Sequence, residues 1–228
     1  MARFEVIIPA AGSGTRMGGN TPKLLLEVGG KAIIRRTVEA FLNFFPDCRL
    51  TVVAGEDSAD AIKQALADLP VRYAPGGTSR SESVYNGLMS LGSLDIDPKA
   101  KVLVHDGARC LIDKDTIARV LDALERFDAV TCGVPEKNTF KKVIRRGDDI
   151  IVDKTPPRTD YYEVQTPQGF KYKTMTECFD PALIGDAVTD DVMFAEKAGI
   201  EVAIVEGSYS NIKITTPEDI SFAEGLIG

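Results

Sequence analysis

A glycine-rich segment near the start of the chain holds the first residues that could do chemistry. It reads Ala10-Ala11-Gly12-Ser13-Gly14-Thr15-Arg16-Met17-Gly18-Gly19, and Lys23 follows shortly after it. A glycine-rich loop lets backbone N–H groups converge on an anion without obstruction by Cβ atoms. Arg16 and Lys23 would add two permanent positive charges beside those groups. The segment therefore favours phosphate binding over the alternative, a flexible turn with solvated charges.

This segment matches neither of two common phosphate-binding patterns. The dinucleotide fingerprint needs a third glycine where this chain has Met17, and the P-loop needs a lysine where it has Asn20. What remains is a glycine loop with two cations, which suits a nucleoside triphosphate.

Asp106 and Arg109 form a second cluster, in the segment His105-Asp106-Gly107-Ala108-Arg109. A carboxylate that follows a buried strand can bond ribose hydroxyls or hold a hydrated Mg²⁺, and an arginine can bind a phosphate. The alternative is a plain ion pair between Asp106 and Arg109. His105 is the only histidine in the sequence, which excludes sites that need two imidazoles, and we interpret it as structural.

Three further segments carry polar groups that could contact a ligand. The segment from Gly76 to Ser83 connects a predicted strand to a predicted helix and could read a base edge, although an ordinary helix N-cap is the alternative. Asp190 and Asp191 follow Thr189 and could cap a helix, face a substrate, or both. Lys213 is predicted to lie on a late strand.

The elements that must position these residues alternate between strand and helix. Apolar runs rich in β-branched residues predict buried strands at 4–9, 50–54, 71–74, 102–105, 129–134 and 202–205. Apolar residues at helical spacing predict helices near 33–45, 61–69, 84–91, 117–124, 173–179, 190–197 and 216–226. This order predicts an α/β fold with a doubly wound, mostly parallel sheet that binds its ligand beyond the carboxyl ends of the strands.

The alternation breaks between about 136 and 163. Two short alternating runs, Lys141–Arg145 and Asp149–Asp153, flank Arg146-Gly147-Asp148 and predict a β-hairpin. Its charged faces offer little to the main core, so we expect a projecting arm. An isolated two-stranded ribbon is only marginally stable in water, so we expect the arm to dock on a second subunit.

The composition argues against a disordered, collagen-like or coiled-coil chain. Charged residues make up 27% of the chain and hydrophobic residues 44%, which is typical of a globular domain. The 27 Lys and Arg against 34 Asp and Glu give a net charge of -7, which opposes nucleic-acid binding. A small anionic substrate would therefore need a local basic cluster.

The cysteines and the apolar runs bear on the cellular compartment. The four cysteines form no CxxC pair, so we expect reduced, mostly buried thiols rather than a zinc site. No apolar run approaches the length that crosses a bilayer, and the first strand begins too early for a signal peptide to precede it. We therefore expect a cytoplasmic protein with no membrane partner.

Taken together, these segments resemble the 2-C-methyl-D-erythritol 4-phosphate cytidylyltransferases of the non-mevalonate isoprenoid pathway. The resemblance covers nearly the whole chain in order: AAGSGTRMG with PK at 22 and 23, GG at 76 and 77, SVYNGL at 83–88, VHDGAR at 104–109, QTPQGF at 165–170, TDD at 189–191 and NIKITTPEDI at 211–220. It implies a nucleotidyltransferase with a Rossmann-like sheet. It also implies a single domain over residues 1–228 and an arm at about 136–163 that swaps across a homodimer.

Carried onto the matching positions, the resemblance implies three groups of site residues. Arg16 and Lys23 would be catalytic, binding the triphosphate of CTP and stabilising the transition state. The nucleotide would be bound by Ala10, Ala11, Gly12, Ser13, Gly14, Gly77, Ser83 and Asp106. The acceptor would be bound by Arg109, Thr189 and Lys213, together with Thr139 and Arg158 from the partner's arm.

The implied reaction is an in-line attack by the acceptor's phosphate oxygen on the α-phosphorus of CTP, with pyrophosphate as the leaving group. Because the nucleophile is already anionic, catalysis would consist of positioning and charge stabilisation, with no role for His105 as a base. The CTP phosphates would carry most of the coordination of Mg²⁺, and Asp106 is the one candidate protein contact.

The sequence departs from the family pattern at a few positions. Leu24 replaces a common glutamine, Gly107 and Cys110 replace the alanine and proline of HDAARP, and Asn138 replaces an aspartate before the arm threonine. These departures concern the acceptor more than the nucleotide. The alternatives are therefore a ribitol 5-phosphate cytidylyltransferase, which shares nearly every motif, or another sugar-nucleotide pyrophosphorylase. A catalytically silent nucleotide sensor is the non-enzyme alternative.

Overall fold

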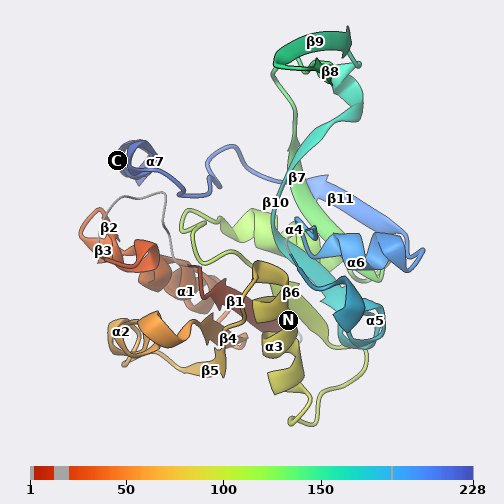
Figure 1. The fold of residues 1–228 in the computed structure, drawn as a ribbon. Helices are drawn as coiled ribbons and strands as arrows, with labels where there is room; N and C mark the ends of the chain where they lie inside the picture. Colours follow the sequence, from red (N-terminus) through yellow and green to blue (C-terminus); the bar gives the residue numbers. More distant parts are fainter. Residues whose placement is uncertain (1–2, 13–20, 186, 228) are drawn as a thin grey trace.

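The computed structural model describes residues 3–12, 21–185 and 187–227 of the 228-residue chain. Within these residues the central sheet has seven strands in the order β11-β7-β10-β6-β1-β4-β5 (Figure 1). They are β1 (Glu5–Ala10), β4 (Arg49–Ala54), β5 (Val71–Pro75), β6 (Lys101–Val104), β7 (Ala129–Pro135), β10 (Tyr162–Lys171) and β11 (Val202–Glu206). β10 runs antiparallel to β6 and β7, and the other neighbours are parallel. The predicted α/β fold with a mostly parallel sheet is confirmed.

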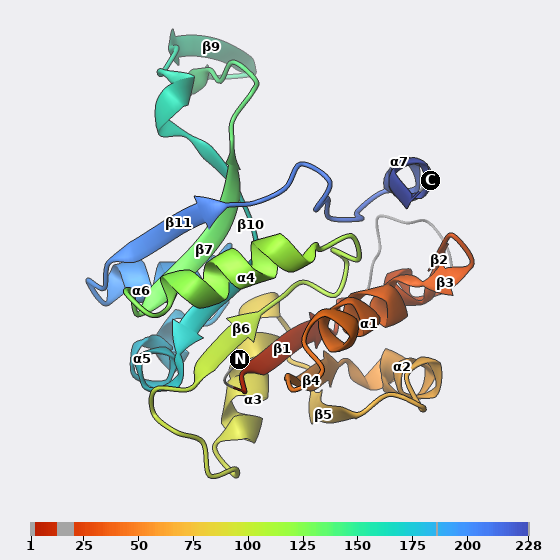
Figure 2. The ribbon, with the colours of Figure 1, turned by 180° about the vertical axis from the view of Figure 1, so that it is seen from behind.

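Helices cover both faces of the sheet because successive strand residues point into two different cores. In β1, Val6 and Ile8 belong to one core and Ile7 to the other, and all three are fully buried. The first core receives side chains from α1 (Ile33–Phe44), α2 (Ala59–Ala65), α4 (Lys114–Ala123) and α7 (Pro217–Ile227). The second receives them from α3 (Arg80–Leu91), α5 (Tyr172–Cys178) and α6 (Val192–Lys197). Figure 1 shows α3, α5 and α6 in front of the sheet, and Figure 2 shows α1 and α4 on the opposite face.

The strand β10 was not predicted from the sequence. Its segment, YEVQTPQGFK, contains a proline, a glycine and two glutamines, so it lacks the β-branched run that marks the other strands. Its pairing with β7 shifts register between Gln165 and Gly169, the stretch that contains Pro167. The irregular register explains why neither alternation nor a continuous apolar run is visible in this segment.

The late strand predicted around Lys213 is wrong. Residues 207–216, all of which the structure describes, contain no strand. The backbone is held instead by isolated bonds: the Ile214 N–H donates to the Ala108 carbonyl at 2.9 Å, and the side-chain amide of Asn211 donates to the Thr166 carbonyl at 2.8 Å. Lys213 therefore lies on a loop that is bonded to the segment after β6 and to the middle of β10.

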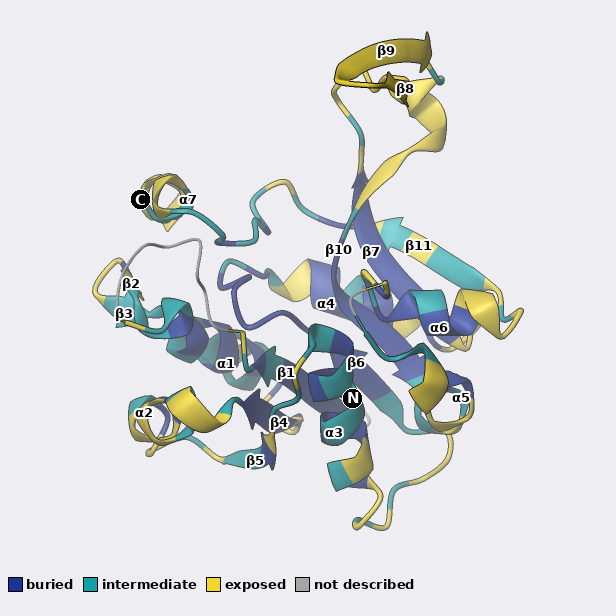
Figure 3. Ribbon diagram, viewed as in Figure 1, coloured by how far each residue is buried: buried dark blue, intermediate teal, exposed yellow. Residues whose placement is uncertain are grey.

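The predicted hairpin is confirmed. β8 (Lys142–Arg146) and β9 (Asp149–Lys154) pair antiparallel around Gly147, whose φ of 61° suits a tight turn. The hairpin projects from the body, and Figure 3 shows its strands exposed. The apolar side chains exposed on it are Val143, Ile144, Ile150, Ile151 and Val152. The expectation of charged faces was thus incomplete, because the hairpin also carries apolar surface.

β2 (Glu27–Val28) and β3 (Lys31–Ala32) form a short hairpin after the 3₁₀ turn η2 (Lys23–Leu25). All four cysteines are buried and free, as predicted. In the part of the chain that the structure describes, no helix has the length and apolar character needed to span a membrane.

The strand order reverses beside β1. The chain passes from β1 to β4 and β5 on one side, then returns to β6 on the other. The connections that leave β1 and β6 therefore diverge, and an opening between their carboxyl ends is expected at this point.

Candidate functional site

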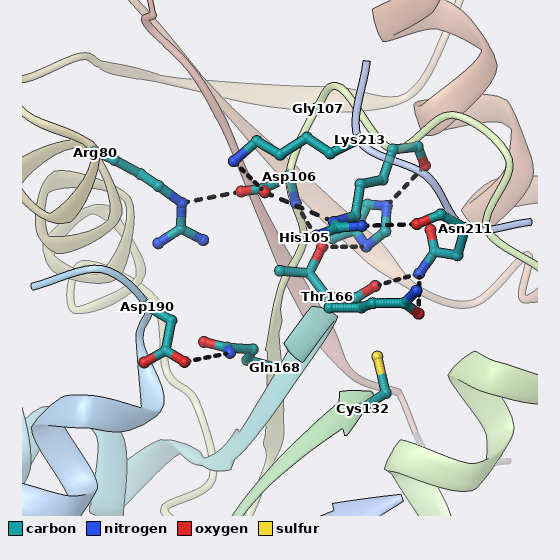
Figure 4. Close-up of polar contacts among 12 residues, drawn as sticks. Arg80, His105, Asp106, Gly107, Cys132, Thr166, Gln168, Asp190, Asn211 and Lys213 are labelled. Atoms are coloured by element: carbon teal, nitrogen blue, oxygen red, sulfur yellow. Dashed lines mark hydrogen bonds and ion pairs between the residues drawn. The ribbon is translucent and has the colours of Figure 1, made fainter. Parts of the chain in front are cut away.

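Two neighbouring pockets open where β1 and β6 end. The larger has a volume of about 530 Å³ and the smaller about 240 Å³. Arg80, Asp106 and Lys213 line both pockets, and we call these three residues the boundary cluster. Figure 4 shows Arg80 and Lys213 directed at the Asp106 carboxylate.

The larger pocket contains most of the residues predicted to bind the nucleotide. The described residues of that group all line it: Ala10, Ala11, Gly12, Gly77, Ser83 and Asp106. Lys23, predicted to be catalytic, lines it as well and opens η2. Ser13, Gly14 and Arg16 lie outside the described residues.

The smaller pocket contains the residues predicted to bind the acceptor, apart from those of the arm. Arg109, Thr189 and Lys213 all line it, although they come from three distant parts of the sequence. Gln165, Thr166 and Gln168 of β10 supply one wall. The unpredicted strand therefore contributes a side of the smaller pocket.

Thr139 and Arg158 lie on the arm. Arg158 begins the 3₁₀ turn η4 (Arg158–Asp160), where its Nη1 atom donates to the Lys137 carbonyl at 3.0 Å. Both residues are exposed, and the described residues that line the two pockets include neither of them. The chain therefore does not bring its own arm to its own pockets.

The pockets form a basic region on an acidic chain. Among the described residues, four cationic side chains line them (Lys23, Arg80, Arg109 and Lys213) against two carboxylates (Asp106 and Asp190). The local net charge is +2, whereas the whole chain carries -7. The local basic cluster expected for an anionic substrate is thus present at this edge of the sheet.

The Asp106 carboxylate is buried between cations. Its Oδ1 accepts a hydrogen bond from Arg80 Nε at 2.9 Å, and its Oδ2 lies 2.8 Å from Lys213 Nζ and 3.8 Å from Arg109 Nε. Burial by itself would raise the pKa of Asp106, but the three neighbouring charges hold that pKa well below its ordinary value. The predicted pair between Asp106 and Arg109 is therefore the longest of three, and the carboxylate stays ionised.

Arg80 was not identified as a site residue from the sequence. Its Nη1 and Nη2 atoms lie 2.9 and 2.8 Å from the two carboxylate oxygens of Asp191, whose side chain is fully buried. Burial raises the pKa of Asp191, and the Arg80 charge opposes that shift. Asp191 makes no side-chain capping bond and is not among the described residues that line either pocket, so neither predicted role describes it. Asp190 meets both, because it accepts a hydrogen bond from the Met193 N–H at 3.1 Å and lines the smaller pocket. From the sequence alone, an arginine at the start of a helix that pairs with a buried carboxylate cannot be distinguished from one that points into solvent.

His105 is structural, as predicted. Nε2 lies 3.1 Å from the Arg109 carbonyl and Nδ1 3.1 Å from the Thr166 hydroxyl. The carbonyl can only accept, so these partners assign the proton to Nε2. Burial lowers the pKa of His105 to about 4, so the ring is neutral at pH 7. It packs edge-on against Phe41 with ring centroids 5.1 Å apart.

The segment before α3 serves as a helix cap and as a pocket wall. Ser79 Oγ accepts a hydrogen bond from the Glu82 N–H at 3.1 Å, which makes Ser79 the N-cap. Ser83 Oγ accepts from the Gly77 N–H at 3.0 Å and donates to the Ser79 carbonyl at 2.9 Å. The capping bonds therefore fix the backbone of the residues that face the larger pocket.

The sequence profile of a family described as 2-C-methyl-D-erythritol 4-phosphate cytidylyltransferase matches residues 4–228. The chain is 40% identical to a protein of that description from Nostoc punctiforme, over 97% of each chain. The resemblance predicted from the motifs is confirmed.

Solved structures agree in fold as well as in sequence. A 4-diphosphocytidyl-2C-methyl-D-erythritol synthase from Anaerococcus prevotii superposes with a TM-score of 0.82, at 34% identity over 98% of this chain and 95% of that one. The corresponding values for a 2-C-methyl-D-erythritol 4-phosphate cytidylyltransferase from Thermus thermophilus are 0.78, 30%, 99% and 98%.

Proposed function

Because the chain belongs to the 2-C-methyl-D-erythritol 4-phosphate cytidylyltransferase family, we propose that it transfers CMP from CTP to 2-C-methyl-D-erythritol 4-phosphate and releases pyrophosphate. The reaction would serve the non-mevalonate route to isoprenoids. The observation that carries the proposal is the pair of basic pockets with a common wall, one large enough for a nucleotide and one suited to a small phosphate.

The mechanism is direct transfer between two bound anions. An oxygen of the acceptor phosphate attacks the α-phosphorus of CTP, the bond from that phosphorus to the bridging oxygen breaks, and pyrophosphate leaves with the electron pair. Lys23 in the larger pocket, with Arg16, offsets the charge on the triphosphate. Lys213 lines both pockets, so its charge lies beside both reactants. Catalysis then requires no side chain to take a proton from the nucleophile.

Asp106 binds hydroxyl groups rather than metal in this proposal. Its two oxygens already face Arg80 and Lys213, so it does not fit as a direct Mg²⁺ ligand. In the described ranges, no group of three His, Cys, Asp or Glu side chains could hold a metal ion. We propose that Mg²⁺ arrives on the CTP phosphates and keeps its remaining waters, which is the usual arrangement for this ion.

We further propose a homodimer in which the arm of each subunit completes the acceptor pocket of the other. The support is an exposed hairpin with apolar side chains, which is poorly stable alone, and the exposed positions of Thr139 and Arg158. A cytoplasmic location stays a prediction from the sequence.

The decisive experiment compares acceptors and nucleotides in one assay of pyrophosphate release. We expect turnover with CTP and methylerythritol phosphate, and much slower turnover with ribitol 5-phosphate. UTP should be a poor substrate, since a site that pairs the amino group of cytosine leaves polar groups unpaired against uracil. Faster turnover with ribitol 5-phosphate would overturn the acceptor assignment. Equal use of UTP would indicate another pyrophosphorylase, and CTP binding without turnover would indicate a sensor.

A further inference from the structure

Arg80 connects three elements through one guanidinium group. Its Nε atom donates to Asp106 at the end of β6, while Nη1 and Nη2 bind both oxygens of Asp191, which precedes α6. Arg80 itself is the first residue of α3. These contacts use three of its five N–H donors in a planar fork, a geometry that a lysine cannot reproduce.

Asp191 is the fixed end of this arrangement. Its side chain is fully buried, and among the described residues only Arg80 donates to the carboxylate. Its backbone N–H donates to Gln168 Oε1 on β10 at 2.7 Å, which ties it to the sheet. A buried carboxylate with one partner holds that partner firmly, because leaving a buried charge unpaired is strongly unfavourable. The bidentate pair therefore sets the orientation of the guanidinium.

We propose that Arg80 is a positioning residue for the transfer reaction: held by Asp191, it fixes the orientation of the Asp106 carboxylate on the boundary between the two pockets. With Oδ1 occupied by Arg80, Oδ2 stays directed at Lys213. The boundary cluster is thereby kept in one arrangement, with Lys213 beside both reactants. This inference rests on the proposed function.

Asp191 provides the clearest test, because it is not among the described residues that line either pocket. Among the described residues, its carboxylate pairs only with Arg80, so the side chain acts on the pockets through that guanidinium. In Asp191→Asn the guanidinium loses its charged, bidentate anchor, so Asp106 gains freedom. We expect kcat/KM for the acceptor to fall by about 10-fold to 10²-fold, since displacements near 1 Å have such effects. The KM for CTP should rise as well, because Asp106 also lines the larger pocket and is expected to bind the nucleotide.

Glu5→Gln is the matched control. Glu5 is also a buried carboxylate paired with an arginine, Arg72, but it begins β1, at the opposite end of the strands from both pockets. Thermal unfolding of both variants measures the structural cost of losing such a pair. We expect both to lose stability, while only Asp191→Asn loses acceptor kcat/KM.

A double-mutant cycle of Arg80→Lys and Asp106→Asn tests whether Arg80 acts through Asp106. On the wild-type background, Arg80→Lys should reduce acceptor kcat/KM by about 10-fold or more. On the Asp106→Asn background the same change should cost less than about 3-fold, because the carboxylate that it positions is gone. An undiminished effect on that background would mean that Arg80 contacts a substrate directly, which overturns the proposal.

The possible outcomes distinguish a failure of the proposed function from a failure of the positioning role of Arg80. Wild-type protein that releases no pyrophosphate with CTP and the acceptor overturns the proposed function and this inference together. Active wild-type protein with wild-type kinetics in a folded Asp191→Asn variant overturns this inference alone. If Asp191→Asn does not fold, the Arg80→Lys cycle decides the matter by the same criteria.

Discussion

The side chain of Arg109 donates through Nη1 to the main-chain carbonyl of Asn211 at 2.7 Å, across a sequence separation of 102 residues. This bond joins the end of β6 to the loop that carries Lys213. The side-chain amide of Asn211, which is fully buried, donates in turn to the Thr166 carbonyl at 2.8 Å. The position of Lys213 therefore depends on an asparagine that touches neither pocket among the residues described.

The first prediction concerns that asparagine. Asn211→Ala leaves the Thr166 carbonyl without its donor in a buried place, so the free energy of unfolding should fall by about 1–3 kcal/mol. Turnover should fall as well, because the loop no longer fixes Lys213. Urea denaturation and pyrophosphate release measure the two effects. Lys213→Ala is the comparison: it should also lose turnover, but it leaves the bond between Asn211 and Thr166 in place, so any loss of stability there comes from the ion pair with Asp106. Asn211→Ala with full turnover would show that the loop holds its shape without this bond.

A second prediction concerns Lys23 in the larger pocket. Lys23→Ala removes a preorganised charge beside the expected triphosphate, so kcat should fall by about 10²-fold or more while the fold is retained. Circular dichroism checks the fold and pyrophosphate release checks the rate. Lys99→Ala, which removes an exposed lysine far along the chain, should change neither. Near-normal turnover in folded Lys23→Ala protein would remove Lys23 from the mechanism.

The sequence predicted the sheet well because most of its strands are buried on both faces and are therefore continuous β-branched runs, such as Val6 to Ile8. It failed for β10, whose antiparallel path and shifted register leave no periodic pattern. At the site, Asp106 was singled out because it follows a predicted strand, whereas Gly77 and Ser83 were assigned to the nucleotide through the family resemblance.

Arg80 and Asn211 were missed as site components for a different reason. Their importance comes from partners distant in sequence, Asp191 and Thr166, and neither residue type indicates such a partner. Local spacing can predict which residues reach the carboxyl edge of the sheet. It cannot predict which of them hold the others in place, because those bonds depend on tertiary contacts.

A third prediction follows from the burial of His105. Its pKa is lowered to about 4 in the folded protein against an ordinary value of 6.5, so the unfolded chain binds more protons between these values. Stability should therefore fall as the pH is lowered through this window, by roughly 1.4 kcal/mol per pH unit at most. Urea denaturation at pH 7 and pH 5 measures the slope.

His105→Gln supplies the control, since no other histidine is present in the sequence. The variant should be less stable at pH 7 but should lose less stability between pH 7 and pH 5 than the wild type. Equal slopes in the two proteins would mean that His105 is not held neutral by burial. Turnover is not expected to depend on the ionisation of His105, because its two ring nitrogens face the Arg109 carbonyl and the Thr166 hydroxyl.

The last prediction is that the active site is composite, with Arg158 of each arm serving the neighbouring subunit. Arg158 lies on the arm and lines neither pocket among the described residues, whereas Lys23 lies in the larger pocket. Lys23→Ala and Arg158→Ala should each be nearly inactive. Arg145→Ala, an exposed arginine on the same hairpin with no implied contact, should remain active.

The two inactive proteins are then unfolded together and refolded as an equal mixture. Random pairing makes about half of the dimers mixed, and a mixed two-fold dimer has one site with both defects and one with neither. About a quarter of all sites should regain activity if the arm acts across subunits. If the arm serves its own subunit, every site keeps one defect, and the mixture stays as inactive as its components. A tagged pull-down shows whether mixed dimers formed, so that inactive mixtures containing them refute the composite site.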